Sequence, residues 1–134
     1  MVTARLKRMA TEGGVMIFVF IEDGRLDVVG DLKEAQRKYP GIDVESGVFV
    51  FYDENGNYLQ PHFIVPNKQK SIFGLFKRYE SGVFELKANS ETSEDPIWLA
   101  LYETHGLNEN RFFKTLDEVK SFFTSKGINT GRPT

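Results

Sequence analysis

The residues with the most obvious chemistry are an acid and a lysine two positions apart. Glu85 and Lys87 stand in VFELKA, which alternates apolar and polar side chains as a half-buried strand does. On a strand they share one face, as in metal-dependent nucleases, where the acid holds Mg²⁺ and the lysine steadies the attacking water. Such a site needs a further acid, and Glu80 or Asp53 could serve only if the fold brings it close. A solvated ion pair explains both residues equally well, so nuclease chemistry stays an alternative.

Other catalytic sets are missing from the sequence. There is no cysteine, which excludes disulfides, thiolate nucleophiles and cysteine metal clusters. The two histidines, His62 and His105, have no ligand-like partners at short spacing. No P-loop, His-Glu-x-x-His or Gly-x-Ser-x-Gly motif occurs. We therefore expect a non-catalytic protein without a metal ion or a cofactor.

A second candidate lies in KQKSIFGLFKRY, residues 68–79, which interleaves bases with aromatic rings as single-strand nucleic-acid binders do. Its bases are Lys68, Lys70, Lys77 and Arg78. The favoured interpretation is a loop whose apolar members, Ile72, Phe73 and Phe76, enter the core while the bases stay in water. Single-stranded nucleic-acid binding is thus the other alternative function, and the sequence does not favour it.

The third candidate is an acidic, aromatic segment, GIDVESGVFVFYDENGNYLQPHF, residues 41–63. An apolar strand over 48–52 is followed by Asn55-Gly56, a strong hairpin signal. If these two residues form a two-residue loop, Phe51 faces Gln60 and Phe49 faces His62. This mixed face, rimmed by acids without a neighbouring base, has the composition of a protein-binding surface. The predicted partner-binding residues are Asp43, Glu45, Phe49, Phe51, Asp53, Glu54, Tyr58, Gln60 and His62.

An alternative explanation of the same segment stays open. Both faces of the 48–52 strand are apolar, so a helix could cover the mixed face and make Phe49 and Phe51 core residues. In that case the apolar residues need no partner.

The remaining elements are read from periodicity and turn chemistry. Strands are predicted at 15–21 and 26–29 around Asp23-Gly24, and a two-turn helix follows Asp31, with Glu34 at the capping-box spacing. Residues 66–82 are expected to be a long connection with a short strand at 72–78. Two further helices start at Pro96 and at Thr115 and are followed by Gly106 and Gly127. The fold class is α+β, a mainly antiparallel sheet of about five strands with helices packed on one face.

Composition indicates one folded domain. The chain has 134 residues, of which 40% are hydrophobic and 12 are Phe, enough for a real core. We assign 1–15 to an N-terminal extension, 16–127 to a single α+β domain and 128–134 to a frayed tail. The longest apolar run, VMIFVFI, is too short to cross a membrane, and the lack of cysteine fits the cytoplasm.

The order of motifs resembles a family of small bacterial immunity proteins. GIDVESGVF followed by FYDENGNYL resembles the family's Ile-Asp-Val-Glu-x-Gly stretch, aromatic strand and Asp-x-x-Gly turn, and LKEAQRKY, GVFELKAN and LDEVKSFF follow in a similar order over residues 16–125. Such proteins accompany polymorphic or contact-dependent-inhibition toxins. The resemblance implies binding and neutralisation of a cognate protein toxin and fixes no site residues. The long 66–82 segment departs from the pattern.

Overall fold

The computed structural model describes residues 16–72, 74, 76–88 and 96–131, so the predicted extension at 1–15 lies outside the described residues. Six strands form one sheet in the order β7-β4-β3-β1-β2-β8, and two more form a separate hairpin. Neighbouring strands are antiparallel except for β2 and β8. The strands are β1 Ile17–Ile21, β2 Arg25–Val29, β3 Phe49–Asp53, β4 Tyr58–Val65, β5 Lys68–Ile72, β6 Phe76–Glu80, β7 Val83–Ala88 and β8 Gly106–Leu107. The predicted α+β class, with a mainly antiparallel sheet, is confirmed.

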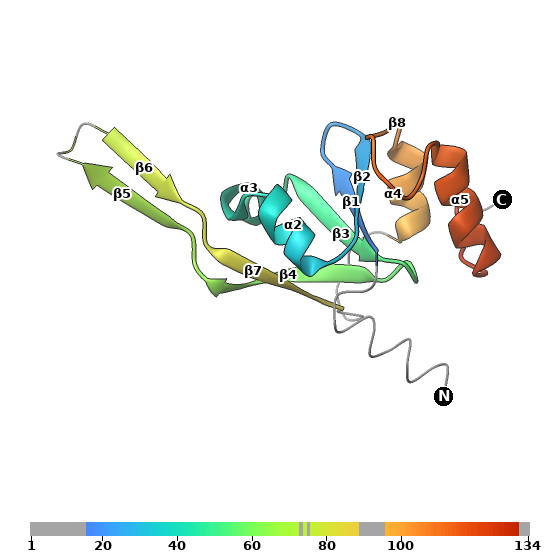
Figure 1. The fold of residues 1–134 in the computed structure, drawn as a ribbon, viewed down its shortest axis with the longest axis horizontal. Helices are drawn as coiled ribbons and strands as arrows, with labels where there is room; N and C mark the ends of the chain where they lie inside the picture. Colours follow the sequence, from blue (N-terminus) through green and yellow to red (C-terminus); the bar gives the residue numbers. More distant parts are fainter. Residues whose placement is uncertain (1–15, 73, 75, 89–95, 132–134) are drawn as a thin grey trace.

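Helices lie on both faces of the sheet, whereas the sequence analysis placed them on one face. The helices of the described chain are α2 Leu32–Lys38, α3 Gly41–Glu45, α4 Ile97–Glu103 and α5 Leu116–Ser125. The α2 and α3 helices pack with Ile17 and Val19 of β1, while α4 and α5 pack with Phe18 and Phe20 of the same strand. Figure 1 shows β1 and β2 between the two helix pairs. Because consecutive strand residues point to opposite faces, an apolar β1 needs cover from both sides.

The two N-caps predicted from capping-box spacing, Asp31 and Thr115, are confirmed. The Asp31 carboxylate accepts a hydrogen bond from the Glu34 N–H at 2.8 Å, and the Thr115 hydroxyl accepts one from the Glu118 N–H at 3.2 Å. Pro40 follows the end of α2 as expected, but Gly41 begins the short α3 helix, which was not predicted. α4 ends at Glu103, so Gly106 lies beyond it, in β8.

The β3–β4 hairpin has a different register from the predicted one. Phe51 pairs with Leu59 and Tyr52 with Tyr58. The loop between them is longer than two residues because the Asp53 carboxylate accepts hydrogen bonds from the N–H groups of Asn55 and Asn57, at 2.8 and 2.9 Å. A one-residue change in register moves every side chain of one strand to the other face relative to its partners.

β4 has a neighbouring strand on both sides at its start and on one side only farther along. Its pairing with β3 covers Tyr58 and Leu59, while pairing with β7 continues from Leu59 to Val65 with an irregularity after Phe63. Pro61 therefore pairs only with β7. This arrangement fits the expectation that a proline without an N–H sits at an edge or a bulge.

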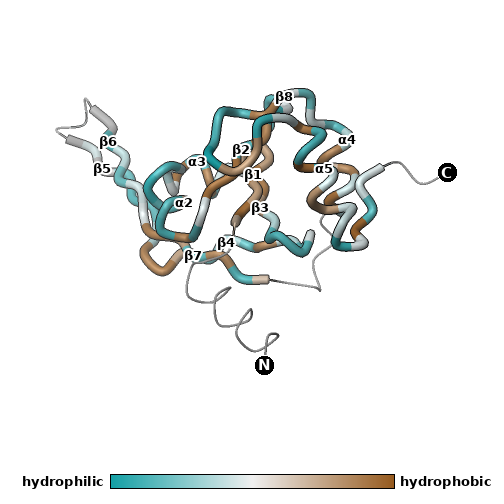
Figure 2. The backbone as a smooth tube through the Cα atoms, turned by 45° about the vertical axis from the view of Figure 1, so that its right-hand side comes forward, coloured by the Kyte–Doolittle hydropathy of each residue, from teal (hydrophilic) through white to brown (hydrophobic). Residues whose placement is uncertain are grey.

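Residues 66–82 form a hairpin where the sequence analysis expected a long connection. β5 and β6 pair antiparallel from Lys68–Glu80 to Ile72–Phe76. We call residues 68–80 the hairpin arm, which projects away from the body of the protein (Figure 1). In Figure 2 the central strands β1 and β2 are brown, hence hydrophobic, whereas the arm is mostly teal and white.

The domain includes the beginning of the predicted tail. The Ile128 N–H donates to the Phe123 carbonyl at 3.1 Å, and its side chain packs against the core beneath α5. Among the described residues, no helix is both long enough and apolar enough to span a bilayer.

Candidate functional site

The structure covers the aromatic part of the predicted partner-binding surface. Phe51 is fully buried, and Phe49 is half-buried with its ring centroid 4.6 Å from that of Tyr39 on α2. Both rings lie in the core beneath α2 and α3. The prediction that Phe51 is exposed for a partner is therefore wrong, and the alternative, that helices cover this face, is correct.

The predicted companions of those rings lie on the other face. Tyr58 packs against the cluster beneath α4 and α5, with its ring centroid 6.1 Å from that of Tyr52. Gln60 and His62 follow Tyr58 at alternate positions of β4, so they share its side of the sheet. His62 is exposed, and Gln60 is half-buried. The sheet thus separates these residues from Phe49 and Phe51.

The four acids of the predicted surface are also dispersed. Asp43 and Glu45 lie on α3, and Asp53 binds the backbone of the β3–β4 turn. Glu54 forms an ion pair with Lys126 next to the C-terminal end of α5, with 3.7 Å between Oε1 and Nζ. The nine predicted residues therefore do not form one continuous surface.

The nuclease alternative gains no second acid. Glu85 and Lys87 form an ion pair with each other at 3.1 Å. Asp53 shares the α2/α3 side of the sheet with Phe51, whereas Glu85 shares the opposite side with His62, its cross-strand partner. Glu80 lies on the hairpin arm. Within the part of the chain that the structure describes, no three His, Cys, Asp or Glu residues come close enough to hold a metal ion.

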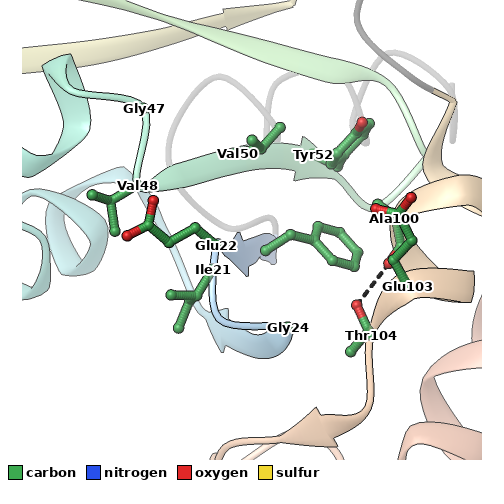
Figure 3. Close-up of a pocket in the computed structure, with 11 residues that line it drawn as sticks. Ile21, Glu22, Gly24, Gly47, Val48, Val50, Tyr52, Ala100, Glu103 and Thr104 are labelled. Atoms are coloured by element: carbon green, nitrogen blue, oxygen red, sulfur yellow. Dashed lines mark hydrogen bonds between the residues drawn. The ribbon is translucent and has the colours of Figure 1, made fainter.

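A hollow of about 280 Å³ opens on the α4/α5 side of the sheet (Figure 3). Phe20, Val50, Tyr52 and Ala100 supply apolar surface, and the polar lining includes Glu22, Glu103 and Thr104; the remaining lining residues are Ile21, Gly24, Gly47 and Val48. We call this site the acidic hollow. Sequence reasoning missed it because its two glutamates belong to the β1–β2 turn and to α4, far apart in the chain, and carry no local motif.

A buried carboxylate joins three elements at the other side of β2. Asp27 is 4% exposed and accepts hydrogen bonds from the Tyr39 hydroxyl, at 2.8 Å, and from the Asn108 amide. Lys38 lies 3.4 Å from the same carboxylate. Burial, followed by the hydrogen bond to Asp27, raises the pKa of Tyr39 well above its usual value of 10.0. The Asp27 carboxylate thus has a hydrogen-bond or ion-pair contact with Tyr39, Asn108 and Lys38, so we interpret this cluster as one that stabilises the fold.

Exposed apolar side chains gather where the hairpin arm joins the sheet. Ile64 is 62% exposed, Tyr79 is 56% exposed, and Val65 and Val83 are each 44% exposed. Val65 and Val83 are cross-strand partners, and Tyr79 is next to Glu80, the last residue of the arm. We call these four residues the root patch. Its one sequence signal is Val83, which alternation places on the polar side of the 83–88 strand.

The two histidines have separate positions. The His105 Nε2 atom lies 2.9 Å from the Asp23 carbonyl oxygen, beside the β1–β2 turn, whereas His62 is exposed on β4.

Comparison of the chain with protein-family models, curated proteins and solved structures finds no match.

Proposed function

We propose that this protein is a non-catalytic protein-binding module that docks through the root patch and the hairpin arm. The observation that carries the proposal is that four exposed apolar side chains, Ile64, Val65, Tyr79 and Val83, lie on the strand ends where the arm joins the sheet. Single exposed apolar residues are ordinary, but several of them beside a projecting element are typical of a protein interface.

The arm extends the proposed interface and gives it a sign. Lys68 and Arg78 are exposed, and the only acid within residues 68–80 is Glu80. Apolar residues beside the arm supply the contact area that desolvation rewards, at roughly 25 cal/mol per Å² of apolar surface removed from water. The bases favour acidic groups on the partner and speed the encounter.

The partner class in this proposal is a cognate bacterial toxin, as the sequence resemblance implies. Neutralisation would follow from occlusion, because a module of this size seated over a toxin's functional surface blocks access to it. Acidic and aromatic side chains, which the sequence analysis located at residues 43–62, occur together instead at the acidic hollow.

The test is co-expression with the product of the neighbouring gene, followed by co-purification, titration of the complex and a growth-protection assay. Changing Ile64→Lys together with Val83→Lys should weaken the complex by at least about 100-fold, because each buried aliphatic side chain contributes about 1.5–3 kcal/mol. Tyr102→Ser is the matched control, since Tyr102 is 59% exposed but lies on α4. No tight complex and no growth protection, or equal affinity of the double variant, contradicts the proposal.

One observation favours a second candidate, single-stranded nucleic-acid binding by residues 68–79. The described strands of this segment, β5 and β6, pair with each other and project from the body of the protein (Figure 1), where a long connection was expected; Phe73 lies outside the described residues. Electrostatic binding of this kind weakens steeply with salt. Low-salt binding of single-stranded RNA that survives Ile64→Lys with Val83→Lys, in the absence of a protein partner, would favour this candidate over the first.

A further inference from the structure

The acidic hollow is built from a gap between α4 and the sheet. α4 presents Ala100, a small side chain, toward the rings of Phe20 and Tyr52. The centroids of these two rings are 5.4 Å apart, and their planes are perpendicular. Gly24 and Gly47 line the hollow, and both have positive φ, 91° and 85°; a β-carbon at Gly24 would meet the His105 ring, whereas one at Gly47 would meet no atom within 4 Å. A side chain at either position would be strained at this φ, so glycine fixes the backbone of both turns beside the hollow.

The rim is anionic and its carboxylates are available. Glu22 and Glu103 are exposed, and neither forms a hydrogen bond or ion pair through its side chain with another residue in the described part of the chain. No basic residue lines the hollow. The Thr104 hydroxyl is occupied, since it donates to the Ala100 carbonyl at 2.7 Å (Figure 3). The carboxylates of Glu22 and Glu103 are therefore negatively charged hydrogen-bond acceptors at the rim of an apolar, aromatic floor.

This combination selects the chemistry of an occupant. An anion would be repelled by two carboxylates, and a purely apolar group would make no favourable contact with them. A cation carried on an apolar stem satisfies both parts, because the stem covers the floor while the charge meets the rim. Guanidinium suits the site better than ammonium, since it is less strongly hydrated, stacks on aromatic faces and donates hydrogen bonds in a planar fork to carboxylates.

We infer that the acidic hollow receives an arginine side chain of the protein partner, an inference that rests on the proposed function. The arginine anchors the partner on the α4/α5 side of the sheet and contributes specificity, because lysine and neutral side chains lose part of these contacts. A single deeply seated arginine is a common anchor of protein interfaces.

The first test uses peptides and needs no partner. Acetyl-Gly-Arg-Gly-amide, titrated into the ¹⁵N-labelled protein, should shift the amide resonances of Gly24 and Gly47 and bind at least about 10-fold more tightly than the isosteric citrulline peptide, a difference of about 1.4 kcal/mol. The lysine peptide should fall between them. Free arginine should bind more weakly than the peptide because its own carboxylate meets the acidic rim.

Charge-removing variants locate the site. Glu22→Gln with Glu103→Gln should weaken arginine-peptide binding by about 10-fold, whereas Glu109→Gln, an exposed acid outside the hollow, should leave it unchanged. Circular dichroism and unchanged thermal unfolding confirm that the double variant is folded. No shift of Gly24 and Gly47 at tens of millimolar peptide, or equal binding of the citrulline peptide, overturns the inference.

The same double variant separates this inference from the proposed function. A partner complex that forms but keeps full affinity after Glu22→Gln with Glu103→Gln means that the module binds protein without using the hollow. Arginine-peptide binding in the absence of any partner complex means the opposite, a functional hollow and a failed proposal for docking at the root patch.

Discussion

At the scale of single residues, the most demanding group is the buried Asp27 carboxylate. Water cannot solvate it, so its stability depends on Tyr39, Asn108 and the nearby Lys38. These partners come from α2 and from the segment after β8, so the carboxylate connects parts of the chain that are remote in sequence. Removing one donor leaves a buried charge that is only partly satisfied.

Tyr39 should resist ionisation until the protein unfolds. Its pKa is raised in the folded state, so its contribution to the free energy of unfolding is complete below pH 10 and decreases as the pH rises above 10 toward the folded pKa. In absorbance at 295 nm during alkaline titration, Tyr39 should ionise together with the loss of structure. Tyr39→Phe should remove that late step and cost about 1–3 kcal/mol near pH 7, since Asp27 loses a donor.

Tyr102→Phe is the control for this titration, because Tyr102 is 59% exposed and lies on α4; this variant should keep the late step. Ionisation of Tyr39 near pH 10 in a chain that is still folded by circular dichroism would contradict the buried Tyr39–Asp27 contact.

Residue-scale features were predictable where their partners are local. Asp31 with Glu34 and Thr115 with Glu118 are three positions apart, and the capping contacts were read correctly from spacing alone. Asp27 was not recognised, because the donors that satisfy it are distant in the sequence and no pattern around β2 indicates them.

At the scale of elements, the β3–β4 turn caused the largest error in the prediction from sequence. Asn55-Gly56 indicated a hairpin, and a hairpin is present, but hydrogen bonds to the Asp53 carboxylate close a longer loop. Both short and long loops are common around such residues, so sequence alone could not fix the register. That register determined whether Phe51 shared a face with Gln60 or with Leu59, and so whether a docking surface was placed there.

The hairpin arm was missed for a different reason. Strands are recognised in a sequence by the alternation that a buried face imposes, and β5–β6 forms a sheet of its own, separate from the main sheet. Its residues therefore show ambiguous periodicity. The arm is instead defined by pairing and by the contacts at its base.

Asn67 is the main polar contact at the base of the arm. Its side chain donates to the Gly41 carbonyl at 3.0 Å and accepts from the Gly82 N–H at 2.6 Å, so it joins the start of α3 to the connection between β6 and β7. Gly82 fits there because a β-carbon would collide with the Val65 carbonyl. Loss of the Asn67 side chain leaves both backbone groups without these partners.

Asn67→Ala should loosen the arm without unfolding the sheet. Loss of the two hydrogen bonds should cost about 1–3 kcal/mol locally, so amide hydrogen exchange in β5 and β6 should accelerate by about 10-fold or more while β1 and β3 keep their protection. Asn129→Ala is the control, since among the described residues the Asn129 side chain bonds only the nearby Gly131 N–H. Unchanged exchange in β5 and β6 would show that Asn67 does not hold the arm.

At the scale of the whole molecule, the two helix layers are joined around the β2–β8 edge of the sheet. The Asn108 N–H donates to the Leu26 carbonyl at 2.8 Å. Arg111, farther along the same segment, forms two hydrogen bonds with Glu34 on α2, at 2.9 and 3.3 Å. The C-terminal half of the chain is thereby attached to α2 on one face of the sheet, while its helices α4 and α5 pack on the other face.

This arrangement was beyond sequence reasoning because strand order is set by long-range pairing. Local patterns located β1, β2, β3, β4, β7 and three of the helices, but the parallel pairing of β2 with the two-residue β8 has no local signal. The apolar β1 did indicate burial on both faces. Assigning the late helices to one of those faces and α2 to the other required the topology.

The Glu34–Arg111 pair predicts a stabilisation that depends on pH. Hydrogen bonds from Arg111 are the main cause that lowers the pKa of Glu34 below its usual value of 4.5, with a smaller effect of the Gly30 N–H, while partial burial opposes them. Because the folded pKa is depressed, the stabilisation is present above pH 4.5 and is lost as the pH falls through the folded pKa. Arg111 is 64% exposed, so solvent screening keeps the contribution to about 1 kcal/mol or less.

Urea unfolding of Glu34→Gln and of the unchanged protein measures this contribution. The free energy of unfolding should differ by up to about 1 kcal/mol at pH 7, and the difference should shrink at pH 3 and in high salt, because protonation removes the charge and salt screens it. Glu109→Gln, an exposed acid near Arg111 in sequence, should change little at either pH. A difference that is the same at pH 7 and pH 3 would mean that charge at Glu34 does not hold the two layers together, and that packing around the sheet edge does so instead.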